Sequence, residues 1–267
     1  MKQAVWTWEQ IRQGTVTGIK FSEETITDVN LQELQRSHPQ EIRTRKCSRH
    51  VESINGADWE WWLHSHDWWL GLRVQAKKID PQRLIYRNLD KKSRTNRQIE
   101  LLTDKALRNQ PPMIPVYVLY NYWDVRKHDP PWHCGTYAKM IEMLGCSICH
   151  AMSLKHIMDQ GFMDLEMISG QMYPWSCLVC CHGFSEADNG LPKRALDFLR
   201  GAFKEHMKEE EAELLARTEF VVTEAPYYVY RILEGEELEE QEWEKIGVSR
   251  ISLISEKKER SVYATED

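Results

Sequence analysis

The residues best suited to chemistry in this sequence are Asp58, Gln75 and Lys77, which lie on two neighbouring segments. Residues 56–63 and 71–78 each alternate polar with apolar side chains, and this period of two predicts a pair of β-strands. Asp58 lies on the polar face of the first strand, and the other two residues share the polar face of the second. If the two faces coincide, a carboxylate, an amide oxygen and an ammonium form a metal site with a cation beside it.

The turn between these strands decides whether the faces coincide. The connecting segment is short and polar, and a two-residue turn at His66 and Asp67 would close an antiparallel hairpin. In that register Asp58 lies directly opposite Gln75, with Cβ atoms within about 5.5 Å, and Lys77 is one diagonal step away. The sequence therefore predicts that the three side chains meet on one face of one hairpin.

The segments around the hairpin give the order helix, strand, strand, strand, helix, strand, which predicts an α/β fold. Ser22 is a suitable N-cap with acids in the turn that follows it, and Pro39 ends the helix that begins there. The other expected elements are a basic strand at 41–51, a helix at 95–109, a buried strand at 114–120, and late strands at 227–232 and 251–254.

The GAD motif that ends at Asp58 and the QAK motif that ends at Lys77 resemble the signature of the PD-(D/E)XK nuclease superfamily. That superfamily has an αβββαβ core with an acid on the first helix, an aspartate on the second strand and a (D/E/Q)xK motif on the third. The GxD and QxK variant is most similar to the Mrr-type restriction endonucleases. The pattern EETxTD…GADWEWW…VQAK is also similar to that of a bacterial family without an assigned function.

The resemblance covers residues 20–122. It implies a restriction-endonuclease-like αβββαβ core within residues 1–125. The remainder, residues 126–267, is expected to be an α-rich C-terminal extension that contains most of the cysteines.

The resemblance implies a metal-dependent endonuclease that hydrolyses phosphodiester bonds of DNA, with RNA as the second candidate substrate. Mg²⁺, or Mn²⁺ in its place, would be bound by Asp58, Gln75 and an acid of the first helix, because hard cations prefer oxygen ligands. Glu24 is the acid chosen here, and Glu23 is the alternative. Lys77 would orient the attacking water or stabilise the charge on the phosphate.

Bacterial relatives of this type serve in restriction or anti-phage defence, so the resemblance implies a cytoplasmic defence enzyme. Two other functions stay open. One is a nuclease-fold module that has lost its activity, and the other is a zinc-stabilised module that binds nucleic acid or a protein partner. A homodimer also stays open. The intact Asp58, Gln75 and Lys77 favour the enzyme.

Glu60 shares the face of Asp58 and lies opposite Arg73 in the predicted register. It is either a second metal ligand or one half of a cross-strand ion pair. The ion pair is the favoured interpretation, because oppositely charged residues that face each other across a hairpin ordinarily pair.

Two CxxC pairs, Cys146 with Cys149 and Cys177 with Cys180, are separated by 27 residues. This spacing is acceptable for a closed tetrahedral Zn²⁺ site. Both segments are also apolar, and free cysteine is among the most buried residue types. A zinc site, buried structural thiols and a redox-active pair are therefore the three alternatives.

Positive charge is concentrated in the first part of the chain. The net charge of −6 argues against a constitutive nucleic-acid binder. However, residues 1–110 hold 19 Lys and Arg against 14 Asp and Glu, whereas the remainder holds 16 against 27. Nucleic acid is therefore expected to bind the basic part through its phosphates. The expected contacts are Arg43, Arg45, Lys91, Lys92 and Arg94.

No segment of the sequence is typical of a membrane protein. The longest apolar run, 114–123, is interrupted by Asn121 and is far too short to span a bilayer. The first residues lack the apolar stretch of a secretory signal. We therefore expect a soluble intracellular protein whose seven cysteines are reduced or metal-bound.

Overall fold

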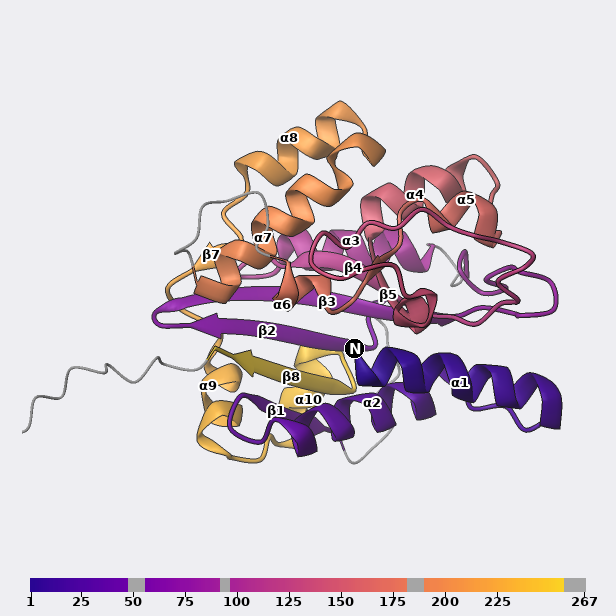
Figure 1. Ribbon diagram of the computed structural model, residues 1–267. Helices are drawn as coiled ribbons and strands as arrows, with labels where there is room; N and C mark the ends of the chain where they lie inside the picture. Colours follow the sequence, from indigo (N-terminus) through magenta and orange to yellow (C-terminus); the bar gives the residue numbers. More distant parts are fainter. Residues whose placement is uncertain (48–55, 92–96, 182–189, 257–267) are drawn as a thin grey trace, which may run out of the picture.

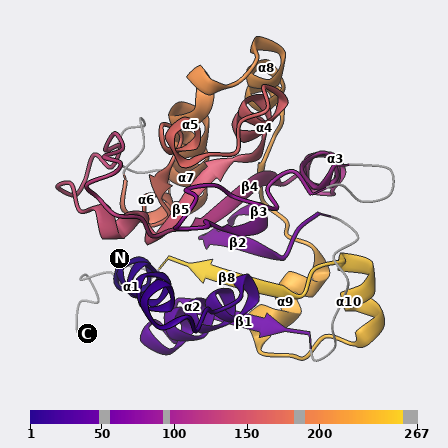
Figure 2. The same cartoon turned by 90° about the vertical axis from the view of Figure 1, so that its right-hand side faces the viewer.

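The computed structural model describes residues 1–47, 56–91, 97–181 and 190–256. In this part of the chain an eight-stranded mixed β-sheet runs through the molecule, and helices pack on both of its faces (Figure 1, Figure 2). The expected α/β fold is therefore confirmed.

The strands of the described residues form one sheet. They are β1 (Ile42–Lys46), β2 (Trp59–Ser65), β3 (Trp68–Lys78), β4 (Ile114–Tyr120), β5 (Cys146–His150), β6 (Tyr173–Pro174), β7 (Val221–Val222) and β8 (Arg250–Ser255). Their order in the sheet is β1-β8-β2-β3-β4-β5-β6, and β7 pairs with β3. Because β2 is antiparallel to β3 and β3 is parallel to β4, the sheet is mixed.

Helices and short 3₁₀ segments connect these strands. They are α1 (Lys2–Thr17), α2 (Glu23–Ser37), α3 (Gln98–Arg108), η1 (Ile141–Gly145), α4 (Ala151–Asp159), α5 (Leu165–Ser169), α6 (Cys177–Cys180), α7 (Gly190–Phe203), η2 (Lys204–His206), α8 (Glu209–Arg217), α9 (Tyr227–Glu234) and α10 (Glu240–Ile246). The run α2-β1-β2-β3-α3-β4 reproduces the expected order of elements. Among the described helices, none combines the length and apolar character that crossing a membrane requires.

The β2–β3 hairpin has the expected register. The two-residue turn at 66–67 is formed, and His66 has a φ of 54°, in the left-handed region. Pairing continues along the strands to Trp59, which lies opposite Val74. Asp58 is the next residue, so it lies beside the end of β3.

Side chains of β2 alternate between two hydrophobic cores, one on each face of the sheet. Trp59 and Trp61 belong to the core that α1, α2 and α7 cover. Trp62 belongs to the core that α3, α4 and α9 cover. All three side chains are buried, so the tryptophan-rich strand is held rigidly from both sides.

β8 confirms the late strand expected at 251–254, but the sequence does not indicate its place in the sheet. It lies between β1 and β2, antiparallel to the first and parallel to the second. β5, β6 and β7 also come from the second half of the chain and join the same sheet. The boundary expected at residue 125 therefore does not divide the sheet, although the described residues after it are mainly helical, as expected.

Residues 227–232 form helix α9 instead of the expected strand. Val229 and Ile232 are fully buried, and their spacing of three places both on one face of a helix. Pro226 precedes the first turn, and Gly235 ends the helix with a φ of 91°. The apolar residues of this segment therefore follow a helical period rather than an alternating one.

His150, at the end of β5, is a fully buried imidazole. Its Nδ1 accepts a hydrogen bond from the Met152 backbone N–H at the start of α4, and its Nε2 has no partner among the described residues. Burial lowers the pKa of His150 to about 3. The folded protein therefore holds this side chain neutral.

We expect the free energy of unfolding to decrease as the pH falls below about 6.5, because the unfolded chain then binds a proton that folded His150 excludes. This contribution is fully present above about pH 6.5 and is lost toward about pH 3, by up to about 1.4 kcal/mol per pH unit. His150→Asn keeps an acceptor at the N-cap and should flatten the dependence in urea unfolding at several pH values. An unchanged slope would contradict this role.

We expect a fragment that ends at residue 125 not to fold on its own. It lacks β8, so β1 loses its partner and one edge of β2 is left open. Circular dichroism and proton–nitrogen correlation spectra, with the full chain as the control, measure this directly. Well-dispersed amide signals from the fragment would restore residue 125 as a domain boundary.

Candidate active site at the end of the hairpin

Asp58 and Gln75 meet at the open end of the hairpin, as the sequence predicts. Asp58 Oδ2 accepts a hydrogen bond from Gln75 Nε2 at 2.5 Å and another from the Ala76 backbone N–H at 2.8 Å. Gln75 Nε2 also donates to the Ala76 carbonyl oxygen at 3.0 Å. Gln75, expected as a metal ligand, therefore presents its N–H rather than its oxygen to Asp58 and holds the carboxylate in place.

Gln98, the first residue of α3, connects Gln75 to Lys77. Its Nε2 donates to Gln75 Oε1 at 2.6 Å, and its Oε1 accepts a hydrogen bond from Lys77 Nζ at 2.8 Å. Gln75 and Lys77 are only 2% and 4% exposed. Lys77 is therefore a buried positive charge in a fixed position, not a solvated strand lysine.

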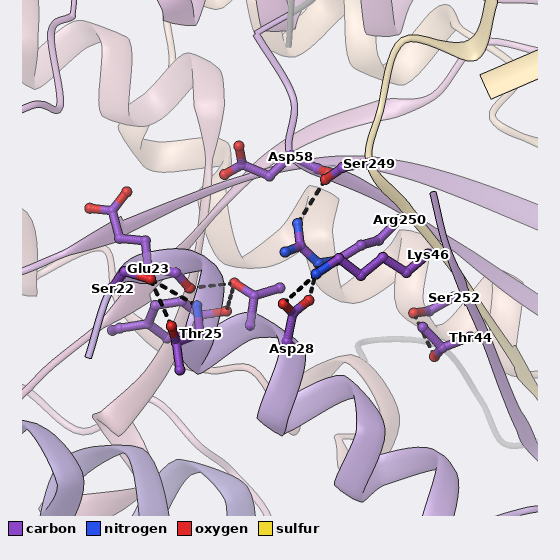
Figure 3. A network of polar contacts seen from close by, with 12 residues as sticks. Ser22, Glu23, Thr25, Asp28, Thr44, Lys46, Asp58, Ser249, Arg250 and Ser252 are labelled. Carbon is purple, nitrogen blue, oxygen red and sulfur yellow. Dashed lines mark hydrogen bonds and ion pairs between the residues drawn. The ribbon is translucent and has the colours of Figure 1, made fainter. Parts of the chain in front are cut away.

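The acid of α2 that faces the site is Glu23, not Glu24. Ser22 caps α2 as expected, so the helix begins at Glu23. Glu23 Oε1 accepts a hydrogen bond from the Lys78 backbone N–H at 2.9 Å, and Figure 3 shows its side chain rising from the helix on the side of Asp58. Glu24 is exposed, because consecutive helical residues are turned by about 100° from one another. Of the two acids considered, Glu23 is therefore the one that lies beside the end of β3.

The charged groups at this end of the hairpin shift one another's pKa values. Burial is the main cause that raises the pKa of Asp58 to about 6, and the Glu23 carboxylate adds to the rise, while the Ala76 N–H and Lys77 oppose it. Burial lowers the pKa of Lys77; Glu23 and Asp58 oppose this change, and Lys91 adds to it. Two carboxylates close together in a partly buried site favour the binding of a further cation.

A second polar network fixes the backbone of Asp58 from the side of β8 (Figure 3). The Ser249 hydroxyl donates to the Asp58 carbonyl oxygen at 2.9 Å, and Arg250 Nη1 donates to Ser249 Oγ at 2.7 Å. Arg250 also pairs with Asp28 of α2 at 2.5 Å, and Lys46 of β1 binds the same carboxylate at 2.7 Å. The network therefore fixes the start of β2 relative to α2.

The oxygen atoms of this site fit a hard divalent cation. Asp58 Oδ1 and Glu23 Oε2 accept no hydrogen bond from any described residue, so each carboxylate keeps one oxygen for a ligand. Mg²⁺ commonly binds one or two carboxylates and keeps several waters. Asp58 and Glu23 are the two carboxylates that could hold such an ion, whereas the Gln75 amide must turn before its oxygen can join them.

Glu60 has a structural role. Its carboxylate pairs with Arg73 across the hairpin at 3.2 Å. It also accepts hydrogen bonds from Trp62 Nε1 at 3.0 Å and from the Tyr228 hydroxyl at 2.7 Å. Because both carboxylate oxygens are engaged and the residue is 1% exposed, the favoured ion pair is confirmed.

The basic residues expected to contact nucleic acid have separate roles. Arg43 and Arg45 donate hydrogen bonds to carbonyl oxygens at the C-terminal end of α9, so they anchor that helix to β1. Lys91 is exposed, and its charge lies close enough to Lys77 to lower the pKa of Lys77. Lys92 and Arg94 lie outside the described residues. Of the expected contacts that can be placed, Lys91 alone lies near the site.

A pocket of about 280 Å³ opens beside Glu23. Its wall includes the cationic side chains of Lys20, Lys78 and Arg87, and also Asp80, whose carboxylate pairs with Arg87. Asp58 is not among the lining residues, so the pocket adjoins the site rather than containing it. With Arg87 paired, Lys20 and Lys78 are the wall cations that could face a phosphate next to a bound cation.

The two CxxC pairs do not form one site. Cys146 donates a hydrogen bond to Thr7 Oγ1 at 3.3 Å, and Cys149 donates to the Gln171 carbonyl oxygen at 3.1 Å. Burial raises the pKa of Cys146 to about 12 and also raises that of Cys149, so both remain thiols. The cysteines that do gather are Cys134, Cys177, Cys180 and Cys181.

Several of these residues have only weak sequence signals. Gln98 lies in the helix expected at 95–109, and its polar side chain near the start of that helix is its one signal. Arg250 directly precedes the strand expected at 251–254, and nothing in the sequence connects it with the hairpin. Cys181 adjoins a CxxC pair, which marks it as a candidate ligand, whereas Cys134 stands alone in the sequence.

We expect Glu60→Ala to destabilise the fold by about 3–5 kcal/mol, because it leaves Arg73 buried without its counter-charge. Glu60→Gln keeps an acceptor oxygen for Trp62 and Tyr228 and should cost less. Chemical denaturation of the two variants beside the native protein measures the difference. An unchanged free energy of unfolding in Glu60→Ala would return Glu60 to the candidate metal ligands.

Comparison with known proteins places the chain in a family. No curated protein matches the sequence. A family of unknown function, DUF6615, matches residues 1–260, a range that includes both the hairpin site and the gathered cysteines. The chain therefore belongs to the DUF6615 family.

Proposed function

We propose that this chain is a metal-dependent nuclease that hydrolyses phosphodiester bonds of DNA. The observation that carries the proposal is the chain of hydrogen bonds that links Asp58 through Gln75 and Gln98 to the Lys77 ammonium at the end of one hairpin. Glu23 of α2 bonds to the Lys78 backbone N–H beside this chain. Hydrolysis of a phosphodiester requires ligands for a divalent cation and a positive charge near the phosphate. The resemblance of the GAD and QAK motifs to the PD-(D/E)XK nucleases indicates the same chemistry.

The proposed cofactor is Mg²⁺ or Mn²⁺, and Asp58 and Glu23 are the residues that would hold it. The ion would supply Lewis acidity toward the phosphate and would lower the pKa of a bound water. Asp58 has a pKa of about 6, so it is ionised in most molecules at neutral pH. Glu23 takes the role first assigned to Glu24, because its carboxylate lies at the end of β3.

Lys77 supplies a positive charge in a fixed position. Gln98 accepts a hydrogen bond from its Nζ, so little freedom remains to be lost when the substrate binds. In hydrolysis the water oxygen bonds to phosphorus as the ester P–O bond breaks, and negative charge grows on the phosphate oxygens. Lys77 stabilises that charge or orients the water, and burial strengthens its field.

A polyanionic substrate must be attracted by local charge, because the net charge of the chain is −6. Lys91 and the pocket wall with Lys20 and Lys78 would contact phosphates beside the one that is cleaved. DNA is proposed ahead of RNA on the strength of the resemblance. A role in bacterial restriction or anti-phage defence, in the cytoplasm, belongs to the same proposal.

We expect Asp58→Asn, Glu23→Gln and Lys77→Met each to lower the cleavage rate by at least about a hundredfold, because each removes a charge that acts on the reacting phosphate. Glu24→Gln is the matched control, since it makes the same change one residue away on an exposed position. Rates are measured on plasmid, single-stranded DNA and RNA with Mg²⁺, Mn²⁺ or EDTA.

Melting temperatures separate lost chemistry from lost fold. Rates at the native level in Asp58→Asn or Lys77→Met would contradict the proposal. A loss of activity in Glu24→Gln but not in Glu23→Gln would return the role of the helix acid to Glu24. If the native protein binds duplex DNA but cleaves no substrate with either metal, the chain is a binding module.

A further inference from the structure

We propose that Cys134, Cys177, Cys180 and Cys181 form a structural zinc site separate from the hairpin site. Their Sγ atoms all lie within 4.8 Å of one another. The Sγ atoms of Cys180 and Cys181 are 3.8 Å apart, and those of Cys134 and Cys181 are 3.9 Å apart. All four residues are free cysteines.

These separations suit one enclosed metal ion. Four thiolates at about 2.3 Å from a tetrahedral Zn²⁺ lie about 3.8 Å from one another. A disulfide would bring two sulfur atoms to about 2.05 Å and leave the other two without a role. Four thiolates complete the coordination of zinc and leave no open position for a substrate water. The site is therefore structural rather than catalytic.

Two segments that are distant in the sequence build this site. Cys177 and Cys180 lie one turn apart on α6, and Cys181 directly follows that turn. Cys134 comes from the connection between β4 and η1. The Thr136 hydroxyl of this connection donates to the Cys180 carbonyl oxygen at 3.0 Å and contacts Cys181 Sγ at 3.6 Å. The connection thus lies against α6, with its cysteine directed to the other three.

The location explains why such a site would be useful. Among the described residues, 121–140 is the longest stretch without a helix or strand. Long irregular segments in a compact domain need particular stabilisation. A zinc ion would join this stretch to α6, which packs against α7 and so against the sheet (Figure 1). Zinc bound only by the folded chain adds its binding free energy to folding.

The buried cysteines 146 and 149 provide matched controls. They form the other CxxC pair of the sequence, but they lie outside the cluster: Cys146 bonds to Thr7, and Cys149 bonds to Gln171. Elemental analysis of protein purified without chelators should give about one zinc per chain. Cys134→Ala and Cys181→Ala should lose most of this zinc, whereas Cys146→Ala and Cys149→Ala should keep it. The reverse pattern would overturn the ligand set.

A second measurement uses the native chain and so does not depend on the folding of any variant. Alkylation before and after chelation, read by peptide mapping, should show that these four thiols react only once zinc is removed. Co²⁺ substitution should give the visible absorption of tetrahedral thiolate coordination. The proposal is overturned if the purified protein contains a disulfide among the four cysteines. It is equally overturned if the protein contains no zinc and takes up none when zinc is supplied.

Discussion

The half-buried carboxylate of Asp58 is the constraint around which the site is arranged. A charge removed from water is unfavourable unless hydrogen bonds replace the lost hydration, and the Ala76 N–H and the Gln75 amide supply them. These bonds exist only in the register that the turn at 66–67 sets, because a slip of one residue would carry Gln75 to the other face. The Asp58 main chain also bonds to Val74 in β3 and to Ser249, which directly precedes β8, so both strands depend on its position.

The same hairpin contains two arrangements of charge, and they differ in whether burial of the charges is compensated. Glu60 and Arg73 are buried and compensate each other, so neither is left as an unpaired buried charge. At the end of the hairpin, burial raises the pKa of Asp58 and lowers that of Lys77, so the charged form of each is disfavoured. Shifted pKa values of this kind, in groups that lie close together, are characteristic of functional sites. The contrast within one hairpin supports a chemical role for its open end.

The parts of this protein that could be predicted from sequence depend on local patterns. The alternating strands and the polar turn determine which residues face Asp58, and Ser22 marks the start of α2. Which of Glu23 and Glu24 faces the sheet could not be predicted, because it depends on a rotation of about 100° per residue that the neighbouring apolar positions alone do not settle. The place of β8 and the approach of Cys134 to α6 depend on residues far apart in the sequence. No local pattern specifies such contacts.

The two proposed metal sites differ in the hardness of their ligands, and that difference separates their roles. Carboxylate oxygens on the hairpin suit Mg²⁺, which exchanges readily and keeps its waters, whereas four thiolates enclose Zn²⁺. A strong chelator removes both ions, so loss of cleavage in EDTA does not by itself identify the catalytic metal. Activity that returns with Mg²⁺ while the zinc content stays constant assigns the chemistry to Asp58 and Glu23. Activity that returns only with zinc assigns the loss to the fold around α6.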